Sequence, residues 1–143
     1  MKNKIIWLTG QSGAGKTTFA KMIGSMIDCI ILDGDEMRES ISLGAGFSKK
    51  DRKEHNLRVA RLAKVLSKQT NVVVAVIAPM EKVRREISDI CDPIWIYVRR
   101  TLPTRKGHFY EEPKRPHYCI DGDEDLKKNT ILMKKIIAGI FNF

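Results

Sequence analysis

Four short runs of the chain are nearly continuous in apolar residues, with little alternation between apolar and polar positions. They cover residues 4–9, 29–32, 71–78 and 94–98, and the clearest is the valine-rich stretch from Val72 to Ile77. Strands that are buried on both faces have this pattern, as in a parallel sheet covered by helices above and below. The four runs therefore predict four strands of a parallel sheet.

Segments with helical spacing of apolar residues separate these runs. The expected helices lie at residues 15–27, 49–69, 80–90 and 124–141. Ser48 and Asp51 have the spacing of a capping box at the start of the second helix, and Asp123 is expected to be the N-cap of the last one. The alternation of strands and helices predicts an α/β fold, a doubly wound parallel sheet with flanking helices.

The segment at about residues 99–122 does not fit this alternation. It contains three prolines, four basic residues between positions 99 and 106, and little apolar content. A structureless loop of this length in a compact domain is usually a functional lid or a disordered segment. We interpret it as a basic lid within a single domain that spans residues 1–143.

Composition places the chain among soluble globular proteins, with 143 residues, 43% apolar and 30% charged. The first apolar run is too short for a signal peptide, and lysines interrupt the apolar C-terminal stretch, so no membrane segment is expected. The cysteines at positions 29, 91 and 119 have neither metal-site nor disulfide spacing. These features favour a cytoplasmic protein with reduced thiols.

The formal net charge of +9 permits two interpretations. Such an excess can serve nucleic-acid binding, or it can line a basic cleft for a polyphosphate. The sequence contains no nucleic-acid-binding motif, and its aromatic residues do not alternate with the basic ones as in a stacking platform. The cleft is therefore favoured, and nucleic acid is disfavoured as a partner.

Residues 10–17 read Gly-Gln-Ser-Gly-Ala-Gly-Lys-Thr, which is the phosphate-binding P-loop pattern G-x-x-x-x-G-K-[ST]. The loop follows a predicted strand and precedes a predicted helix, so its N–H groups can surround a phosphate. Lys16 is expected to reach the β- and γ-phosphates of ATP, and the Thr17 hydroxyl to hold Mg²⁺. The residues expected at the phosphates are Gly10, Ser12, Gly13, Ala14, Gly15, Lys16, Thr17 and Thr18.

A second polar constellation, from Asp33 to Arg38, follows the second predicted strand. Ligands of open α/β sheets bind beyond the carboxyl ends of the strands. A carboxylate there can orient or deprotonate an acceptor hydroxyl and can hold Mg²⁺ through water. Arg38 can bind a phosphate or sulfate with two hydrogen bonds. A polar turn that caps a helix is the alternative, and the preceding P-loop favours the functional interpretation.

Four motifs occur in an order and spacing that resemble the adenylylsulfate kinase family. They are GQSGAGKTT, LDGDEMR, GFSKKDRKEHNLR and the Ile-Ala-Pro turn after the valine-rich strand. Members of that family transfer the γ-phosphate of ATP to the 3′-hydroxyl of adenylyl sulfate. The resemblance covers residues 4 to about 98 well, and it implies a P-loop kinase that uses ATP and Mg²⁺. Because members often form dimers, a homodimer is a candidate assembly.

The resemblance also implies roles for individual residues. Asp35 matches the catalytic carboxylate beside the acceptor hydroxyl, and Asp33 matches its partner near the metal. Either of them would hold Mg²⁺ through water, together with Thr17. The remaining matches concern the acceptor and the lid, namely Arg38 and Arg52 for its phosphosulfate, Phe47 for its base, the lining turn Ile77, Ala78 and Pro79, and Lys106 and Gly107 of the lid. Arg84 falls at the arginine that follows this turn in the family.

The departures from the family pattern fall on the acceptor contacts and the lid. His55 stands where the family has asparagine, and Ala78-Pro79-Met80 replaces Ser-Pro-Tyr. The Phe-Thr-Gly-Ile segment is missing because the lid is shorter. His55 could donate to an acceptor phosphate or be a solvated helix residue. Retained transfer groups beside altered base-reading groups suggest a changed acceptor.

Three functions therefore remain open. Phosphorylation of adenylyl sulfate is the family default, and phosphorylation of cytidine diphosphoramidate, by a kinase similar to this family, is the alternative. A non-catalytic protein that binds nucleotide or RNA is the candidate from another class, and the intact Asp35 argues against it.

Overall fold

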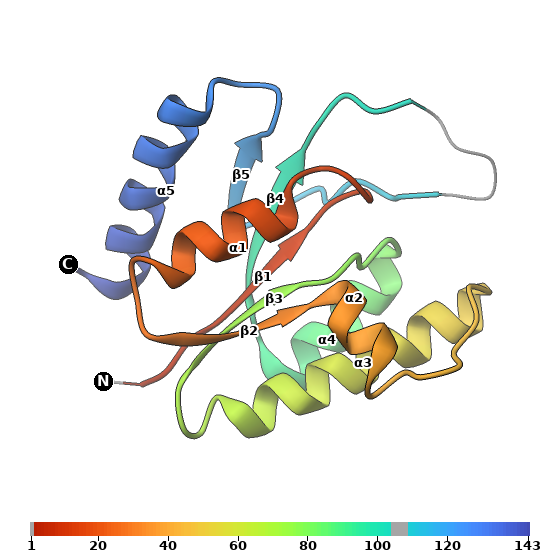
Figure 1. Cartoon of the computed structure of the whole chain (residues 1–143). Coiled ribbons are helices and arrows are strands. Elements are labelled where there is room, and N and C mark those ends of the chain that lie inside the picture. The colour runs from red at the N-terminus through yellow and green to blue at the C-terminus, as the bar shows by residue number, and fades with distance from the viewer. Residues whose placement is uncertain (1, 104–108) are drawn as a thin grey trace.

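Five parallel strands form one sheet in the order β2-β3-β1-β4-β5 (Figure 1). The computed structural model describes residues 2–103 and 109–143. The strands are β1 (Ile5–Thr9), β2 (Cys29–Asp33), β3 (Asn71–Ala75), β4 (Ile94–Arg99) and β5 (Tyr118–Asp121). The four predicted strands are confirmed, although the third ends at Ala75 instead of residue 78.

Strand β5 was not predicted, and its presence corrects the expected bounds of the lid. Arg99 belongs to β4, and Tyr118–Asp121 pairs with β4 in parallel register. The signal was weak because only four residues form the strand, and of these only Ile120 is fully buried. The part of the predicted lid that remains outside the sheet thus lies between β4 and β5.

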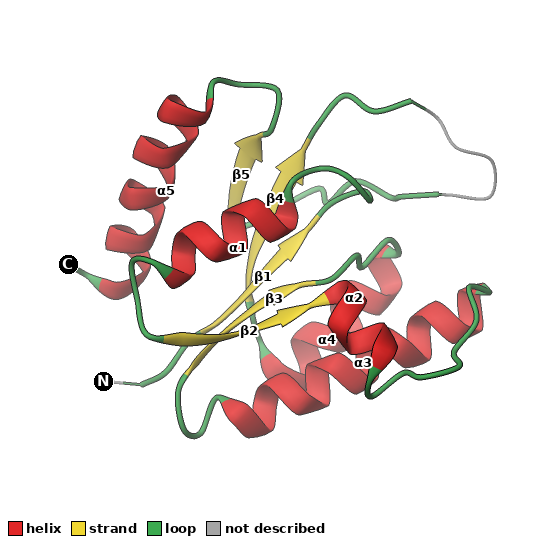
Figure 2. Cartoon of the chain, in the orientation of Figure 1, coloured by secondary structure: helices red, strands yellow, loops and turns green. Residues whose placement is uncertain are grey.

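Helices cover both faces of the sheet, as the doubly wound prediction required (Figure 2). They are α1 (Lys16–Gly24), α2 (Gly34–Glu39), α3 (Lys49–Leu66), α4 (Glu81–Cys91) and α5 (Leu126–Phe141). One face packs against α1 and α5, and the other against α3 and α4. The short helix α2 was not predicted.

The N-terminal caps of α3 and α5 were both predicted from the sequence. The capping box of Ser48 and Asp51 at the start of α3 is confirmed. For α5 the prediction was wrong, because Asp125 is the N-cap and accepts a hydrogen bond from the backbone N–H of Lys127. The Asp123 carboxylate instead accepts from the backbone and the hydroxyl of Thr101 and pairs with Arg99.

Side chains of β1 alternate between two buried layers, which explains why its sequence is continuously apolar. Ile6 and Leu8 face α1 and α5, whereas Ile5 and Trp7 face α3 and α4. The Trp7 ring lies against that of Trp95 on β4, with 5.4 Å between the ring centroids. Each fully buried aliphatic side chain of this kind stabilises the fold by about 1.5–3 kcal/mol. The sheet is thus a firm support for the loops at its edge.

All five strands point the same way, so their carboxyl ends share one edge. The P-loop leaves β1 there, and α2 leaves β2 there. Such an edge is where open α/β sheets bind ligands. Across the described ranges, every helix is too short or too polar to cross a lipid bilayer.

Candidate active site

The P-loop has a backbone that only glycine adopts without strain at two positions. Gly13 and Gly15 have φ of 84° and 101°, in the left-handed region. Gly10 is required for another reason, because a Cβ there would lie 2.5 Å from the carbonyl oxygen of Val98. Gly10 and the buried Ala14 shape the loop and do not line the cleft beside it. The six other residues predicted at the phosphates do line it, namely Ser12, Gly13, Gly15, Lys16, Thr17 and Thr18.

Lys16 is buried, and its ammonium group is held by the loop itself. Its Nζ donates to the carbonyl oxygens of Gly10 and Gln11 over 2.9 and 2.8 Å. Burial lowers the pKa of Lys16 to about 8, against the opposing effect of the Asp33 carboxylate. A bound anion would favour the charged form of this side chain.

Asp33 joins the P-loop to α2. One carboxylate oxygen accepts from the Thr17 hydroxyl over 2.8 Å, and the other accepts from the backbone N–H of Asp35 over 3.2 Å. Asp33 is thus the N-cap of α2, as the alternative interpretation of this segment required. The cap also fixes the carboxylate opposite Thr17, so a capping role and a metal-binding role are compatible.

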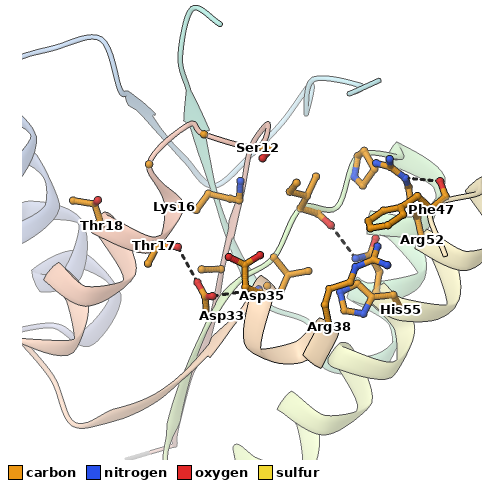
Figure 3. Close-up of a pocket in the computed structure, with 18 residues that line it drawn as sticks. Ser12, Lys16, Thr17, Thr18, Asp33, Asp35, Arg38, Phe47, Arg52 and His55 are labelled. Carbon is orange, nitrogen blue, oxygen red and sulfur yellow. Dashed lines mark hydrogen bonds between the residues drawn. The ribbon is translucent and has the colours of Figure 1, made fainter. Parts of the chain in front are cut away.

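Asp35 is exposed in the first turn of α2 and lines the cleft. Its carboxylate accepts no hydrogen bond from the described part of the chain. In Figure 3 it lies between the P-loop residues and a group formed by Arg38, Phe47 and Arg52. The carboxylate is therefore available to a hydroxyl group brought into the cleft.

Two guanidinium groups flank one aromatic ring on the far side of the cleft. Arg38 lies over the Phe47 ring at 4.4 Å from its centroid, and Arg52 lies 5.8 Å from it. Backbone carbonyls orient both groups, because Arg38 donates to Gly46 and Arg52 donates to Phe47. Phe47 is 68% exposed. A flat, anionic ligand would match an open ring between two cations.

His55 is buried, so the interpretation of it as a solvated helix residue is wrong. It is 3% exposed, and its Nδ1 lies 2.6 Å from the Ser42 hydroxyl, which also accepts from Arg58. Burial, with the nearby charges of Arg38 and Arg58, lowers the pKa of His55 to about 4. Because Arg58 donates to Ser42, the Ser42 hydroxyl is free to donate to Nδ1, and this arrangement favours a neutral ring with its proton on Nε2.

The predicted acceptor turn is fixed from behind by Arg84. Ile77 and Pro79 line the cleft, whereas Ala78 is fully buried and does not. The Arg84 guanidinium donates to the carbonyl oxygens of Ala78 and Glu111. Arg84 therefore supports this turn from outside the cleft lining.

The chain that follows the undescribed residues is attached to the same turn. The backbone N–H of Glu111 donates to the Pro79 carbonyl over 2.8 Å, and the Tyr110 hydroxyl lies 2.7 Å from the Thr9 hydroxyl. The ring of Phe109 lies 5.7 Å from the Arg52 guanidinium. Lys106 and Gly107, predicted to belong to the lid, lie outside the described residues.

One cleft of about 560 Å³ contains most of the predicted site residues. It is lined by residues of the P-loop, both aspartates, Arg38, Phe47, Arg52, His55, and Ile77 and Pro79 of the turn. It can hold a polyphosphate at one end and an anionic acceptor at the other, with a carboxylate between them. This arrangement fits phosphoryl transfer, which depends on positioning and charge neutralisation.

Comparison with known proteins also indicates a phosphoryl-transfer enzyme. The adenylylsulphate kinase family model matches residues 2–108. A probable adenylyl-sulfate kinase from Bacillus subtilis (strain 168) is 31% identical over 169 residues, which cover 92% of this chain and 84% of that protein. An adenylyl-sulfate kinase from Myxococcus xanthus is 31% identical over 153 residues, covering 85% of this chain and 83% of that protein.

The chain belongs to the adenylylsulfate kinase family. Among solved structures, an APS kinase from Mycobacterium tuberculosis in complex with AMPPNP and APS is 24% identical, with a TM-score of 0.80 over 95% of this chain and 98% of that one. A shikimate kinase from Acinetobacter baumannii in complex with shikimate is 18% identical, with a TM-score of 0.61 over 98% and 94%. These two likenesses support the doubly wound fold of this chain.

Within this adenylylsulfate kinase family member, four cleft residues were missed by sequence reasoning: Gly34, Asn56, Ala75 and Val76. Gly34, Ala75 and Val76 lie where the strands end, and only the fold reveals that they meet. Asn56 had a signal, because it is a polar residue on the buried stripe of α3 that continues through Val59 and Ala60. A polar side chain on such a stripe requires a partner.

Proposed function

We propose that this chain transfers the γ-phosphate of ATP to the 3′-hydroxyl of adenylyl sulfate. Membership of the adenylylsulfate kinase family supports the reaction. The observation that carries the residue roles is the position of Asp35, between the P-loop and the group of Arg38, Phe47 and Arg52, in one cleft (Figure 3).

The P-loop binds the triphosphate. Its N–H groups and the N-terminus of α1 hold the phosphate oxygens, and Lys16 moves from the carbonyls of Gly10 and Gln11 to the β- and γ-phosphates. The lowered pKa of Lys16 supports this step, because it shows that burial has removed water from the ammonium group. A phosphate oxygen would take the place of that water and stabilise the charge. The charge of the ammonium group then stabilises the oxygens that gain charge during transfer.

Asp35 orients the acceptor hydroxyl and receives its proton. The acceptor oxygen forms a bond to the γ-phosphorus while the bond between that phosphorus and the bridging oxygen of ADP breaks. Arg38 and Arg52 bind the anionic phosphosulfate, Phe47 stacks on the base, and Ile77 and Pro79 form the adjoining wall. Holding both reactants in line is the main source of catalysis.

The residues beside the P-loop fit a magnesium ion. The Thr17 hydroxyl and the Asp33 carboxylate lie within hydrogen-bond distance of each other, and hard oxygen donors are the ligands that Mg²⁺ prefers. Thr17 would bind the ion directly, and Asp33 or Asp35 through water. An ion held there would supply positive charge against the phosphates.

We also propose that the described residues belong to one kinase domain whose lid begins after β4. Arg99 is the last residue of β4, and beyond the undescribed residues the ring of Phe109 lies 5.7 Å from the Arg52 guanidinium. Basic residues of the lid would close over the phosphates and exclude water as a competing acceptor.

The acceptor is tested by measuring ADP formation with a panel of small molecules. Adenylyl sulfate is expected to support turnover well above the rate without an acceptor, and mass spectrometry should find one added phosphate. Turnover with cytidine diphosphoramidate in place of adenylyl sulfate would keep the kinase and replace the acceptor. Tight RNA binding without turnover on any member of the panel would refute the kinase itself.

A further inference from the structure

Asn56 has a buried amide oxygen that lacks a hydrogen-bond donor. The residue is 1% exposed, and its Nδ2 donates to the carbonyl oxygen of Ile77 over 2.9 Å. A carbonyl can only accept, so the amide orientation is fixed with Nδ2 toward Ile77. The Oδ1 atom then has no donor anywhere in the described residues.

Leaving this oxygen unpaired has a cost that the fold does not explain. A buried acceptor without a donor destabilises a protein by about 1–3 kcal/mol. The next residues of the same helix stripe, Val59 and Ala60, are fully buried and apolar, so an apolar side chain would suit the packing at position 56. Asn56 also lines the cleft, which makes a bound ligand the natural source of the missing donor.

The polar groups near Asn56 in the cleft offer the opposite chemistry. Arg38, Arg52 and His55 line the same cleft, and guanidinium groups and a neutral imidazole with its proton on Nε2 donate hydrogen bonds. Arg52 lies four residues before Asn56, so the two share one face of α3. These hydrogen-bond donors suit the anionic part of the substrate that receives the phosphate. The Asn56 oxygen accepts hydrogen bonds on the same wall of the cleft, and it suits an N–H or O–H group of that substrate.

We propose that Asn56 is a specificity-determining residue whose Oδ1 accepts a hydrogen bond from the nucleoside part of the acceptor. The ligand group takes the place of the atoms that now cover this oxygen. The inference rests on the proposed function. For adenylyl sulfate the donor is either the 6-amino group of adenine or the ribose 2′-hydroxyl, because the 3′-hydroxyl is directed to Asp35. A ligand with a carbonyl at that place would set two acceptors against each other and be rejected.

The experiment compares dissociation constants of three ligands for the whole chain by calorimetry. The ligands are adenylyl sulfate, its inosine analogue without the amino group, and its 2′-deoxy analogue without the hydroxyl. The wild-type protein is expected to bind one of the two analogues about tenfold more weakly than adenylyl sulfate. The identity of that analogue distinguishes the base from the sugar as the source of the donor.

Asn56→Leu is expected to bind that analogue and adenylyl sulfate within about twofold of each other, because the discriminating oxygen is gone. Asn129→Leu is the matched control. Asn129 is also buried and donates through Nδ2 to a backbone carbonyl, that of Asp121, and this variant should keep the wild-type ratio. The same ratio in Asn56→Leu as in the wild type would overturn the proposal.

The wild-type series decides the question even if Asn56→Leu does not fold. Binding of both analogues within about twofold of adenylyl sulfate would overturn the role of Asn56 and leave the proposed function standing. Absence of any binding of adenylyl sulfate to the wild type would overturn the proposed function, and this inference with it.

Discussion

The Thr17 hydroxyl donates a hydrogen bond to the Asp33 carboxylate over 2.8 Å. This contact joins the first turn of α1 to the end of β2, between two residues that are 16 positions apart in the chain. It places an uncharged oxygen and a charged oxygen side by side at the mouth of the P-loop. The proposed magnesium site depends on this pair.

Replacing Thr17 with valine should remove the hydroxyl while keeping the size of the side chain. We expect kcat to fall roughly 100-fold and the Mg²⁺ concentration for half-maximal rate to rise, since one metal ligand is lost. Thr17→Ser keeps the hydroxyl and should retain most of the activity. Equal Mg²⁺ dependence in the valine variant and the wild type would argue against the site.

Lys16 should take up a proton when ATP binds in alkaline solution. Its pKa in the empty site is about 8 because of burial, and the phosphates should raise it. At pH 8.5 binding should therefore be coupled to uptake of roughly half a proton or more. Because the bound form holds more protons, ATP affinity should fall as the pH rises above about 8.

Calorimetry of ATP binding in two buffers with different ionisation enthalpies measures this uptake. Lys16→Met should bind ATP more weakly and show no such linkage near pH 8.5. Identical heats in both buffers for the wild type would refute the assignment of the buried ammonium to the phosphates.

Acid should weaken the fold through His55. Its pKa is about 4 in the folded protein and about 6.5 when unfolded, so the unfolded chain binds the extra proton first. The contribution of this neutral side chain is fully present above pH 6.5 and is lost as the pH falls from 6.5 towards 4. The slope is at most about 1.4 kcal/mol per pH unit.

Urea unfolding of the wild type and His55→Gln between pH 7 and pH 4.5 isolates this effect from the titration of the carboxylates. The difference in unfolding free energy between the two proteins should shrink as the pH falls. A constant difference over that range would mean that His55 does not titrate as its burial implies.

The sequence predicted the features that depend on local pattern, and it failed where distant segments meet. The P-loop, the capping box of α3 and four strands each have a signal within about ten residues. Strand β5 is too short for such a signal. His55 is buried beside Ser42, which lies thirteen residues earlier in the chain. Asp33 shows best what the sequence alone cannot predict. Its position indicates either a helix cap or a metal ligand, and only the fold shows that the one carboxylate caps α2 and also faces Thr17.

Arg84 should act as a positioning residue for the acceptor turn. Arg84→Met removes the donor to the carbonyl oxygens of Ala78 and Glu111 and, among the described residues, leaves the buried carbonyl of Ala78 with only a long contact of 3.5 Å to the Thr9 hydroxyl. We expect a loss of about 2–4 kcal/mol in unfolding free energy. The KM for the acceptor should rise several-fold while the KM for ATP changes little.

Arg85→Met is the control, because Arg85 is the exposed neighbour on the same helix and should leave both quantities unchanged. An Arg84→Met protein that is destabilised with an unaltered acceptor KM would limit Arg84 to a purely structural role.

The most direct test of the account is ADP formation from ATP and adenylyl sulfate by the wild type and by Asp35→Asn. We predict steady turnover by the wild type, a fall in kcat of about 10²–10⁴-fold in Asp35→Asn, and ATP affinity within about threefold of the wild type in that variant. Glu36→Gln, at the exposed neighbour of Asp35 in α2, should keep the wild-type rate. No ADP formation by the wild type, or full activity in Asp35→Asn, would contradict the proposal that Asp35 directs phosphate to the acceptor hydroxyl.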